Sequence, residues 1–118
     1  MRELDASGFD AAVAGGPVVV DFWAPWCRPC RALETVLGEL EGESWGDLVF
    51  AKLNIDEHPE IGSRYEVLSI PRVMVFAAGE VLGTLVGARP RAHVERWLAE
   101  VLPAGEVEGF AAQGQSDA

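Results

Sequence analysis

The stretch Trp26-Cys27-Arg28-Pro29-Cys30 decides how this chain can fold, because it holds the only two cysteines in the sequence. The apolar run Val18–Trp23 lies just before it and predicts a strand buried on both faces. An amphipathic pattern follows it, in which Leu33, Val36, Leu37 and Leu40 share one face of a helix. The cysteine pair is therefore expected at the point where a strand turns into a helix.

This position favours thiol chemistry. If Cys27 caps the helix, the unpaired amides of the first turn and the positive end of the helix dipole converge on its sulfur. The Cys30 amide can then point at that sulfur and stabilise its negative charge. The thiolate is the form that attacks disulfides, and the spacing lets the second thiol close a ring with the first. We therefore expect Cys27 to be the nucleophile and Cys30 to be the shielded, resolving thiol.

Length and composition exclude several classes of protein. The 118 residues fit one domain, and a hydrophobic content of 49% can fill its core. Nine basic against 19 acidic residues give a formal net charge of −10, which argues against nucleic acid or an anionic membrane as a partner. The apolar runs are too short to cross a bilayer, and the acidic N-terminus does not resemble a secretory signal. We therefore expect a cytoplasmic protein.

A metal site is the alternative use of a cysteine pair. A structural zinc ion normally needs four ligands, and only His58 and His93 remain as obvious nitrogen donors. Neither histidine falls near the cysteines in the expected fold. In a reducing compartment such a pair is catalytic or metal-binding rather than structural. We favour redox chemistry, with no bound cofactor, no metal ion and a redox-active Cys27–Cys30 disulfide.

The rest of the chain alternates strands and helices. Ser7 and Asp10 resemble the two members of a capping box at the start of a first short helix. Further elements are expected as a strand at 49–55, a short helix from Pro59, a hairpin of strands 72–77 and 80–86, and a last helix from about 90 to 102. This order predicts an α/β domain over residues 1–102, with helices on both faces of a mixed sheet. Residues 103–118 are expected to form a mobile tail.

Four blocks of the sequence resemble the thioredoxin family, over about residues 4–102. They are Val20–Cys30 with its Trp-Cys-x-Pro-Cys motif, Ala51–Asp56, Ser69-Ile70-Pro71 and Val86-Gly87-Ala88. The resemblance implies a central mixed five-stranded sheet flanked by four helices, here with a short first strand. It implies a dithiol–disulfide oxidoreductase that reduces client proteins through a mixed disulfide. It also implies re-reduction by thioredoxin reductase, an NADPH-dependent flavoprotein, and we expect a monomer.

Asp21 is the only ionisable residue of its predicted strand. An unpaired carboxylate buried there should have a raised pKa. We interpret it as the proton acceptor for Cys30, acting through water, with Lys52 in the neighbouring strand as its charge partner. The alternative is an aspartate that reaches solvent at a strand end and a lysine that extends outward. The expected catalytic set is Cys27, Cys30, Asp21 and Lys52.

The resemblance also implies a substrate-binding surface around the cysteines. Pro71 is expected in the cis form, which leaves the Ile70 backbone free to pair with an extended substrate. Trp26 would shield the thiols and offer an apolar contact. Gly87 would let a substrate chain approach closely, and the alternative is a plain turn glycine. The residues expected to contact substrate are Trp26, Arg28, Pro29, Ile70, Pro71, Arg72 and Gly87.

Three residues depart from the family's pattern. Arg28 stands where the family usually has Gly, Arg72 where a Thr is common, and Thr35 where a Pro is frequent. Arg28 should favour the Cys27 thiolate, and with Arg31 and Arg72 it would give the site a basic rim suited to acidic substrate surfaces. Because the residues between the cysteines tune the redox poise, an oxidant or isomerase remains an alternative to a reductase. A third alternative is a binding or chaperone module that does not use its thiols.

Overall fold

The computed structural model describes residues 1–43 and 45–103. Within this part, five strands and four helices follow one another as β1 (Arg2–Leu4), α1 (Phe9–Val13), β2 (Val18–Trp23), α2 (Arg28–Glu41), β3 (Val49–Asn54), α3 (Pro59–Arg64), β4 (Arg72–Ala77), β5 (Glu80–Val86) and α4 (Arg91–Val101). The strands form one sheet in the order β1-β3-β2-β4-β5. Strands β1, β3 and β2 are parallel, and β4 and β5 are antiparallel to their neighbours. The predicted fold, including the short first strand, is confirmed.

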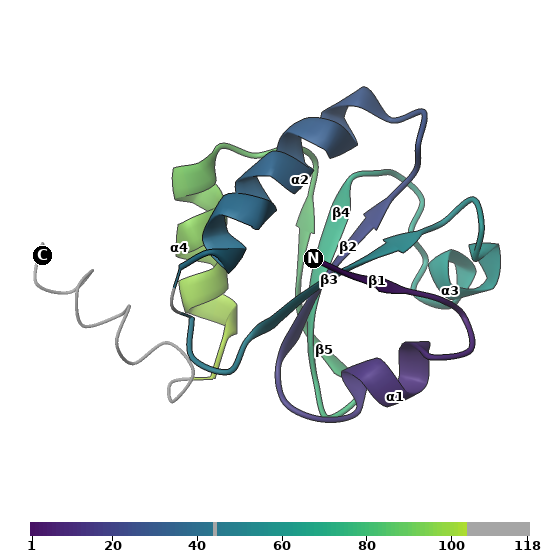
Figure 1. The fold of residues 1–118 in the computed structure, drawn as a ribbon, viewed down its shortest axis with the longest axis horizontal. Helices are drawn as coiled ribbons and strands as arrows, with labels where there is room; N and C mark the ends of the chain where they lie inside the picture. The colour runs from purple at the N-terminus through teal and green to yellow at the C-terminus, as the bar shows by residue number, and fades with distance from the viewer. Residues whose placement is uncertain (44, 104–118) are drawn as a thin grey trace, which may run out of the picture.

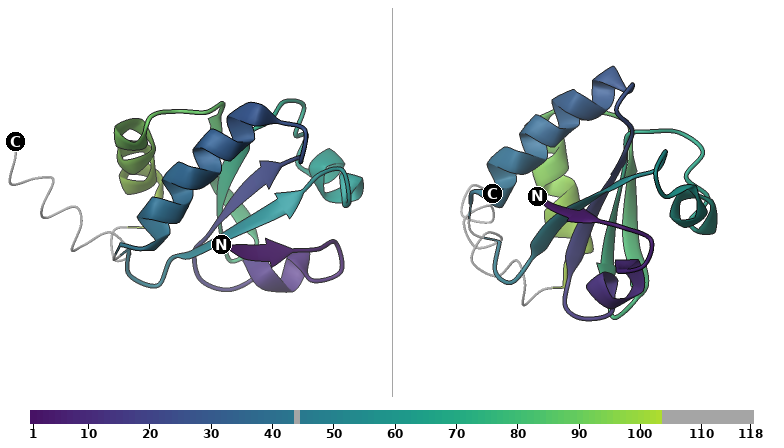
Figure 2. Two further views of the ribbon diagram at one scale, coloured as in Figure 1. Left: turned by 45° about the horizontal axis from the view of Figure 1, so that its top comes forward. Right: turned by 45° about the vertical axis from the view of Figure 1, so that its right-hand side comes forward.

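Helices cover both faces of the sheet (Figure 1). α2 and α4 lie on one face, and α1 and α3 lie on the other; the two turned views in Figure 2 show the same separation. Successive side chains of β2 point to opposite faces of the sheet, and both faces are buried. Val19 packs under α2 and α4, while Val18 and Val20 pack under α1 and α3. This explains why β2 lacks any polar alternation in its sequence.

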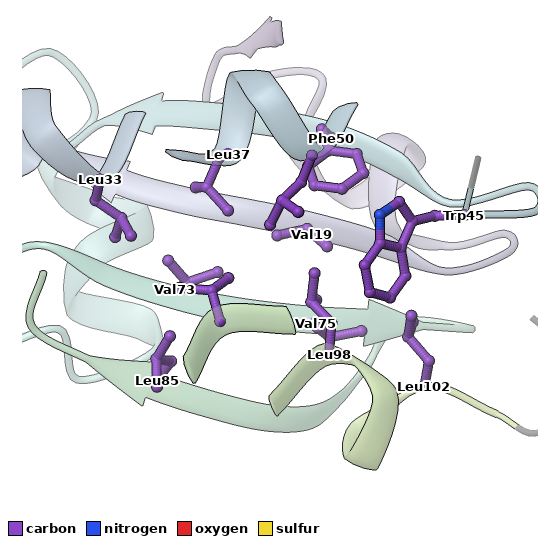
Figure 3. Close-up of a cluster of buried hydrophobic side chains, with 12 residues drawn as sticks. Val19, Leu33, Leu37, Trp45, Phe50, Val73, Val75, Leu85, Leu98 and Leu102 are labelled. Atoms are coloured by element: carbon purple, nitrogen blue, oxygen red, sulfur yellow. The ribbon is translucent and has the colours of Figure 1, made fainter. Parts of the chain in front are cut away.

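Aliphatic side chains fix α2 to the sheet. Leu33 and Leu37 of α2 are buried against Val19, Val73 and the α4 side chains (Figure 3). Complete burial of one such side chain contributes about 1.5–3 kcal/mol. Several of them together hold the helix that carries the cysteines in a single position.

An aromatic cluster fills the opposite face. The rings of Phe9 and Phe76 lie edge to face with centroids 5.5 Å apart, and Tyr65 packs on Phe76 at 5.2 Å. Phe22 of β2 completes the group. Because Tyr65 directly follows α3, this packing also fixes the start of the loop that leads to Pro71.

The predicted cap of α1 is wrong. Gly8 occupies the N-cap position, and the carboxylate of Asp5 accepts hydrogen bonds from the Gly8 amide at 2.8 Å and from Ser7 Oγ at 3.0 Å. Asp10 forms an ion pair with Arg64 instead of turning back on the helix. An aspartate that bonds the backbone a few residues ahead competes directly with a serine cap, and here it prevails.

Two further predictions from the sequence are that no segment spans a membrane and that residues 103–118 form a mobile tail. No helix among residues 1–43 and 45–103 is long and apolar enough to span a bilayer. The predicted tail, apart from Pro103, lies outside the described residues.

Candidate active site

The two cysteines lie at the N-terminus of α2, joined by a disulfide. Cys27 is the N-cap residue, and its Sγ accepts a hydrogen bond from the Cys30 amide at 3.2 Å. Their Cα atoms are 5.3 Å apart. The predicted contact between the Cys30 amide and the Cys27 sulfur is confirmed. It places a backbone donor and the positive end of the helix dipole at the atom expected to carry negative charge.

Both sulfur-bearing residues are buried, Cys27 at 4% exposure and Cys30 at 1%. They pack against Ala24, Trp23 and Ile70. Cys27 is therefore the slightly more exposed of the two, and both are almost fully buried.

Arg28 and Pro29 form the first turn of α2 and are both exposed. Pro29 loses no hydrogen bond there, because the first amides of a helix have no partner within it. The Arg28 side chain forms no hydrogen bond or ion pair with the described residues 1–43 and 45–103. Arg31, one turn further on, bonds the Pro25 carbonyl through Nη2 at 3.0 Å. Of these two arginines, Arg28 is the exposed one without a partner in the part of the chain that the structure describes.

Trp26 stands out from the surface beside Cys27, with 67% of its area exposed. Its indole Nε1 donates a hydrogen bond to Asp56 Oδ2 at 2.9 Å. Asp56 was not among the predicted site residues. A signal for it existed, because the parallel strands β2 and β3 end at the same edge of the sheet and so bring Trp26 and Asp56 together.

The Ile70–Pro71 peptide bond is cis, as predicted. The Ile70 backbone makes no hydrogen bond with another backbone group of residues 1–43 and 45–103. The Pro71 carbonyl accepts a hydrogen bond from the Gly87 amide at 2.9 Å. Gly87 has a φ of 88°, and a Cβ there would meet nothing closer than Arg89 Nε at 4.0 Å. Its backbone conformation favours glycine, and the space beside it is open.

A shallow hollow of about 280 Å³ lies between Trp26 and the loop before Pro71. Its lining is largely apolar and comprises Trp26, Ile55, Val67, Leu68, Ser69 and Ile70. Leu68 is 89% exposed. Sequence reasoning missed Leu68, since a single leucine in a loop carries no periodic signal.

Arg72 ties this loop together. Its Nη1 donates to the Glu66 carbonyl at 2.9 Å and its Nη2 to Ser69 Oγ at 3.1 Å. Glu66 has a φ of 53°, a left-handed backbone conformation that residues other than glycine seldom adopt. The two guanidinium bonds hold the segment that carries Leu68 and Ile70. Arg72 therefore stabilises this loop, a structural role that the sequence analysis, which assigned it to a basic rim, did not predict.

Asp21 is fully buried on the α2 face of β2, and neither of its carboxylate oxygens has a hydrogen-bond partner among the described residues 1–43 and 45–103. Burial is the main cause that raises its pKa to about 7, and the negative charge of Glu34 adds to the effect. The positive charge of Lys52 acts in the opposite direction. The predicted rise in the pKa of Asp21 is confirmed, and a carboxyl group of this kind can exchange a proton near neutral pH.

Lys52 acts on Asp21 through its charge, as predicted, but a close ion pair between the two side chains is not formed. Their Cα atoms are paired across β2 and β3, yet Lys52 Nζ lies 3.0 Å from Glu34 Oε1 and 4.0 Å from Glu3 Oε1. The ammonium also sits 4.8 Å from the centre of the Trp23 ring. The long side chain of Lys52 lets its ammonium group reach a partly exposed position where water still solvates it. A fully desolvated ion pair with the buried Asp21 carboxylate is thereby avoided. Burial alone would lower the pKa of Lys52, but Glu34, Glu3 and Asp21 together raise it.

Comparison with known proteins agrees with this geometry. The sequence profile of the thioredoxin family matches residues 1–100. The chain belongs to the thioredoxin family. It is 44% identical over 96 residues to the thioredoxin of Staphylococcus epidermidis, an alignment that covers 81% of this chain and 88% of that protein. It is 44% identical over 105 residues to thioredoxin M2, chloroplastic, of Arabidopsis thaliana, covering 87% of this chain.

The chain spans 56% of the length of that Arabidopsis thioredoxin. It spans the same share, 56%, of the M-type chloroplastic thioredoxin of Chlamydomonas reinhardtii, to which it is 49% identical over 78 residues. The match with the bacterial thioredoxin, in contrast, extends over most of both proteins.

Among residues 1–43 and 45–103 no cluster of three or more His, Cys, Asp or Glu side chains could hold a metal ion. As a thioredoxin family member, the chain carries its redox centre in the Cys27–Cys30 disulfide. Sequence reasoning also overlooked Glu34 of α2, whose carboxylate accepts a hydrogen bond from Lys52. Its position, one helical turn after Cys30, was the available signal.

Proposed function

We propose that this protein reduces disulfide bonds in client proteins by dithiol–disulfide exchange. The observation that carries the proposal is the hydrogen bond from the Cys30 amide to Cys27 Sγ at the start of α2. That donor and the helix dipole favour the Cys27 thiolate, which is the attacking species in such exchange.

The reaction proceeds in two displacements. The Cys27 thiolate attacks one sulfur of the client disulfide, forms a mixed disulfide and releases the other client sulfur as a thiolate, which takes a proton. Cys30, once deprotonated, attacks Cys27 Sγ, breaks the mixed disulfide and releases the second client thiolate. The protein ends with the Cys27–Cys30 disulfide, and two electrons have passed to the client.

Asp21 is the proposed acceptor of the Cys30 proton, acting through water. Its burial and its lack of a hydrogen-bond partner among the described residues support this role. With a pKa of about 7, the carboxyl group can take up a proton when Cys30 attacks and release it again near neutral pH. Lys52 acts on the reaction through the charge of Asp21.

Substrate binding is proposed to combine a backbone pairing with an apolar contact. The Ile70 backbone, which has no backbone hydrogen bond within the described residues, can pair with an extended client segment beside the open space at Gly87. Trp26 and the hollow that ends at Leu68 offer apolar surface. Arg28, Pro29 and Arg72 complete the contact surface around Cys27, which would favour acidic client surfaces.

Partners and location belong to the same proposal. A relative from Mycobacterium leprae is named a bifunctional thioredoxin reductase/thioredoxin; it is 41% identical over 100 residues, covering 84% of this chain and 22% of that protein. We infer that a thioredoxin reductase using NADPH returns the electrons, and that the protein works as a cytoplasmic monomer without a bound cofactor. The plant relatives are named chloroplastic, so compartment varies within the family.

Reduction of insulin disulfides by dithiothreitol tests the activity without a cognate reductase. The oxidised protein should accelerate insulin precipitation many-fold, and Cys27→Ser should show only the rate of dithiothreitol alone. A wild-type rate equal to that background would favour a binding module. The redox potential, measured against glutathione, then separates a reductase from the more oxidising alternative, because a potential near that of an oxidant would argue against client reduction.

A further inference from the structure

The charge of Lys52 acts on Asp21, but its ammonium is bonded to a different carboxylate, that of Glu34. Its Nζ donates to Glu34 Oε1 at 3.0 Å, while both oxygens of Asp21 lack a hydrogen-bond partner within residues 1–43 and 45–103. The side chains of Lys52 and Glu34 are 19% and 37% exposed, whereas Asp21 is completely buried. Glu34 therefore draws the positive charge toward solvent and away from Asp21.

Glu34 is placed for this task by the active-site helix. It follows Cys30 by four residues in α2, so the two side chains lie on one side of the helix. Leu33 and Leu37 anchor the same part of α2 in the core. The Glu34 carboxylate is thereby held at the boundary between the core beneath α2 and the solvent, above the end of the Lys52 side chain.

The charges around Asp21 come from a small set of groups. Lys52 on β3 stabilises its ionised form, and Glu34 on α2 opposes it. Glu3 on β1 reaches the Lys52 ammonium at 4.0 Å, further than Glu34 does. On β4 the residue paired with Asp21 is Val73, which carries no charge. Cys30 of α2 is the group that gives up the proton.

We propose that Glu34 is a positioning residue for the exchange reaction, because it keeps the Lys52 ammonium away from Asp21 and so keeps Asp21 basic enough to take the Cys30 proton. The inference rests on the proposed function, in which Asp21 accepts that proton. Neutralising Glu34 removes a repelling charge and also frees Lys52 to approach Asp21. Both changes favour the ionised carboxylate, so Asp21 becomes ionised at lower pH and a weaker base.

The first test is a carbon-13 NMR titration of the Asp21 carboxyl group in the oxidised protein, where no thiol titrates alongside it. Glu34→Gln should lower the midpoint by more than about 0.5 pH unit, since an ionised neighbour shifts a buried carboxyl group by about one unit or more. Glu60→Gln is the matched control, the same charge change on α3 at the opposite face, and should leave the midpoint in place. Lys52→Met should raise it. An unchanged midpoint in Glu34→Gln overturns the proposal.

The second test measures how fast Cys30 resolves a preformed mixed disulfide as a function of pH. In Glu34→Gln the rate profile should move to lower pH by the same amount as the NMR midpoint, with a lower plateau at high pH. In an Asp21→Asn background Glu34→Gln should change nothing. An effect that persists without Asp21 overturns the positioning role.

The two tests also separate the inference from the function on which it rests. If Asp21→Asn resolves as fast as wild type while the NMR midpoint still moves in Glu34→Gln, the proton-acceptor role of Asp21 fails, and the positioning role of Glu34 in the exchange reaction fails with it. If Asp21→Asn is slow but the midpoint does not move, the function stands and only the role of Glu34 is wrong.

Discussion

The indole of Trp26 is tethered to Asp56, whose Oδ2 accepts the Nε1 hydrogen bond at 2.9 Å. The bond joins the loop after β2 to the segment after β3, so an exposed aromatic ring is held in one orientation next to Cys27. Such a tether reduces the conformational entropy that the ring loses when a client protein binds.

Removing the tether should weaken client binding. We expect Asp56→Ala to raise the KM for insulin about two- to fivefold with little change in kcat, in keeping with about 0.5–1 kcal/mol for one exposed hydrogen bond. Asp56→Asn, whose amide oxygen can still accept the bond, should restore most of the affinity. Glu57→Gln, an adjacent change without this contact, is the control. A KM for Asp56→Ala that matches this control would show that the orientation of Trp26 has no effect on binding.

The two cysteines should fail in different ways when replaced. Cys27→Ser should lose all turnover because no nucleophile remains, whereas Cys30→Ser should attack clients and remain attached to them. Non-reducing gels and mass spectrometry of the trapped species measure this difference. Normal turnover by Cys30→Ser would reverse the assigned roles.

Asp21 should destabilise the folded protein in a way that depends on pH. Burial raises its pKa from the ordinary value of 3.8 to about 7, so the folded state holds the proton more tightly than the unfolded state does. The contribution of Asp21 to stability is therefore most favourable below its unfolded pKa, is lost as pH rises toward 7, and is constant above that. At pH 8 we expect Asp21→Asn to be more stable than wild type by about 1–4 kcal/mol.

Urea denaturation of the oxidised proteins between pH 4 and pH 8 measures this difference. The advantage of Asp21→Asn should shrink as the pH falls toward 4, because Asp21 is then protonated in the folded wild type and the unfolded chain approaches its own carboxyl pKa. A variant that is less stable than wild type at pH 8 would mean that the carboxylate is well paired after all.

Arg28 should make the Cys27–Cys30 disulfide easier to reduce. Its guanidinium begins α2 beside Cys27 and has no partner in the described part of the chain, so its charge favours the thiolate of the reduced protein. We expect Arg28→Gly to lower the redox potential by about 30 mV or less, which is about 1.4 kcal/mol, since an exposed charge is well screened.

Equilibration with glutathione measures that potential, and the ultraviolet absorbance of the thiolate measures how readily Cys27 ionises. Arg96→Gly, on α4, is a control that removes the same charge elsewhere. A potential that rises or stays constant in Arg28→Gly, or unchanged ionisation of Cys27, would contradict the expected effect.

The fold and the cysteine geometry could be predicted because local signals agree there. Each local pattern is compatible with a single element: the apolar run with the buried strand β2, the helical spacing after Cys30 with α2, and the short link between β4 and β5 with a hairpin. The partner of Lys52 could not be predicted, since strand register tells which backbones are opposite and not where a long side chain ends. The cap of α1 failed for a related reason: Asp5, Ser7 and Asp10 all offer oxygens within a few residues, and only the backbone angles decide which is used.

The two hydrophobic clusters support different parts of the site. The thiols depend on α2, whose Leu33 and Leu37 belong to the cluster beneath α2 and α4. The loop before Pro71 depends on Tyr65 and Val67, which pack into the cluster beneath α1 and α3. Reactivity and client affinity are thus supported by separate interiors on opposite faces of one sheet. Core substitutions in one cluster can therefore affect one property of this thiol reductant more than the other. Ile55, which packs on the cysteines as well as in the cluster beneath α1 and α3, is a point where the two properties are coupled.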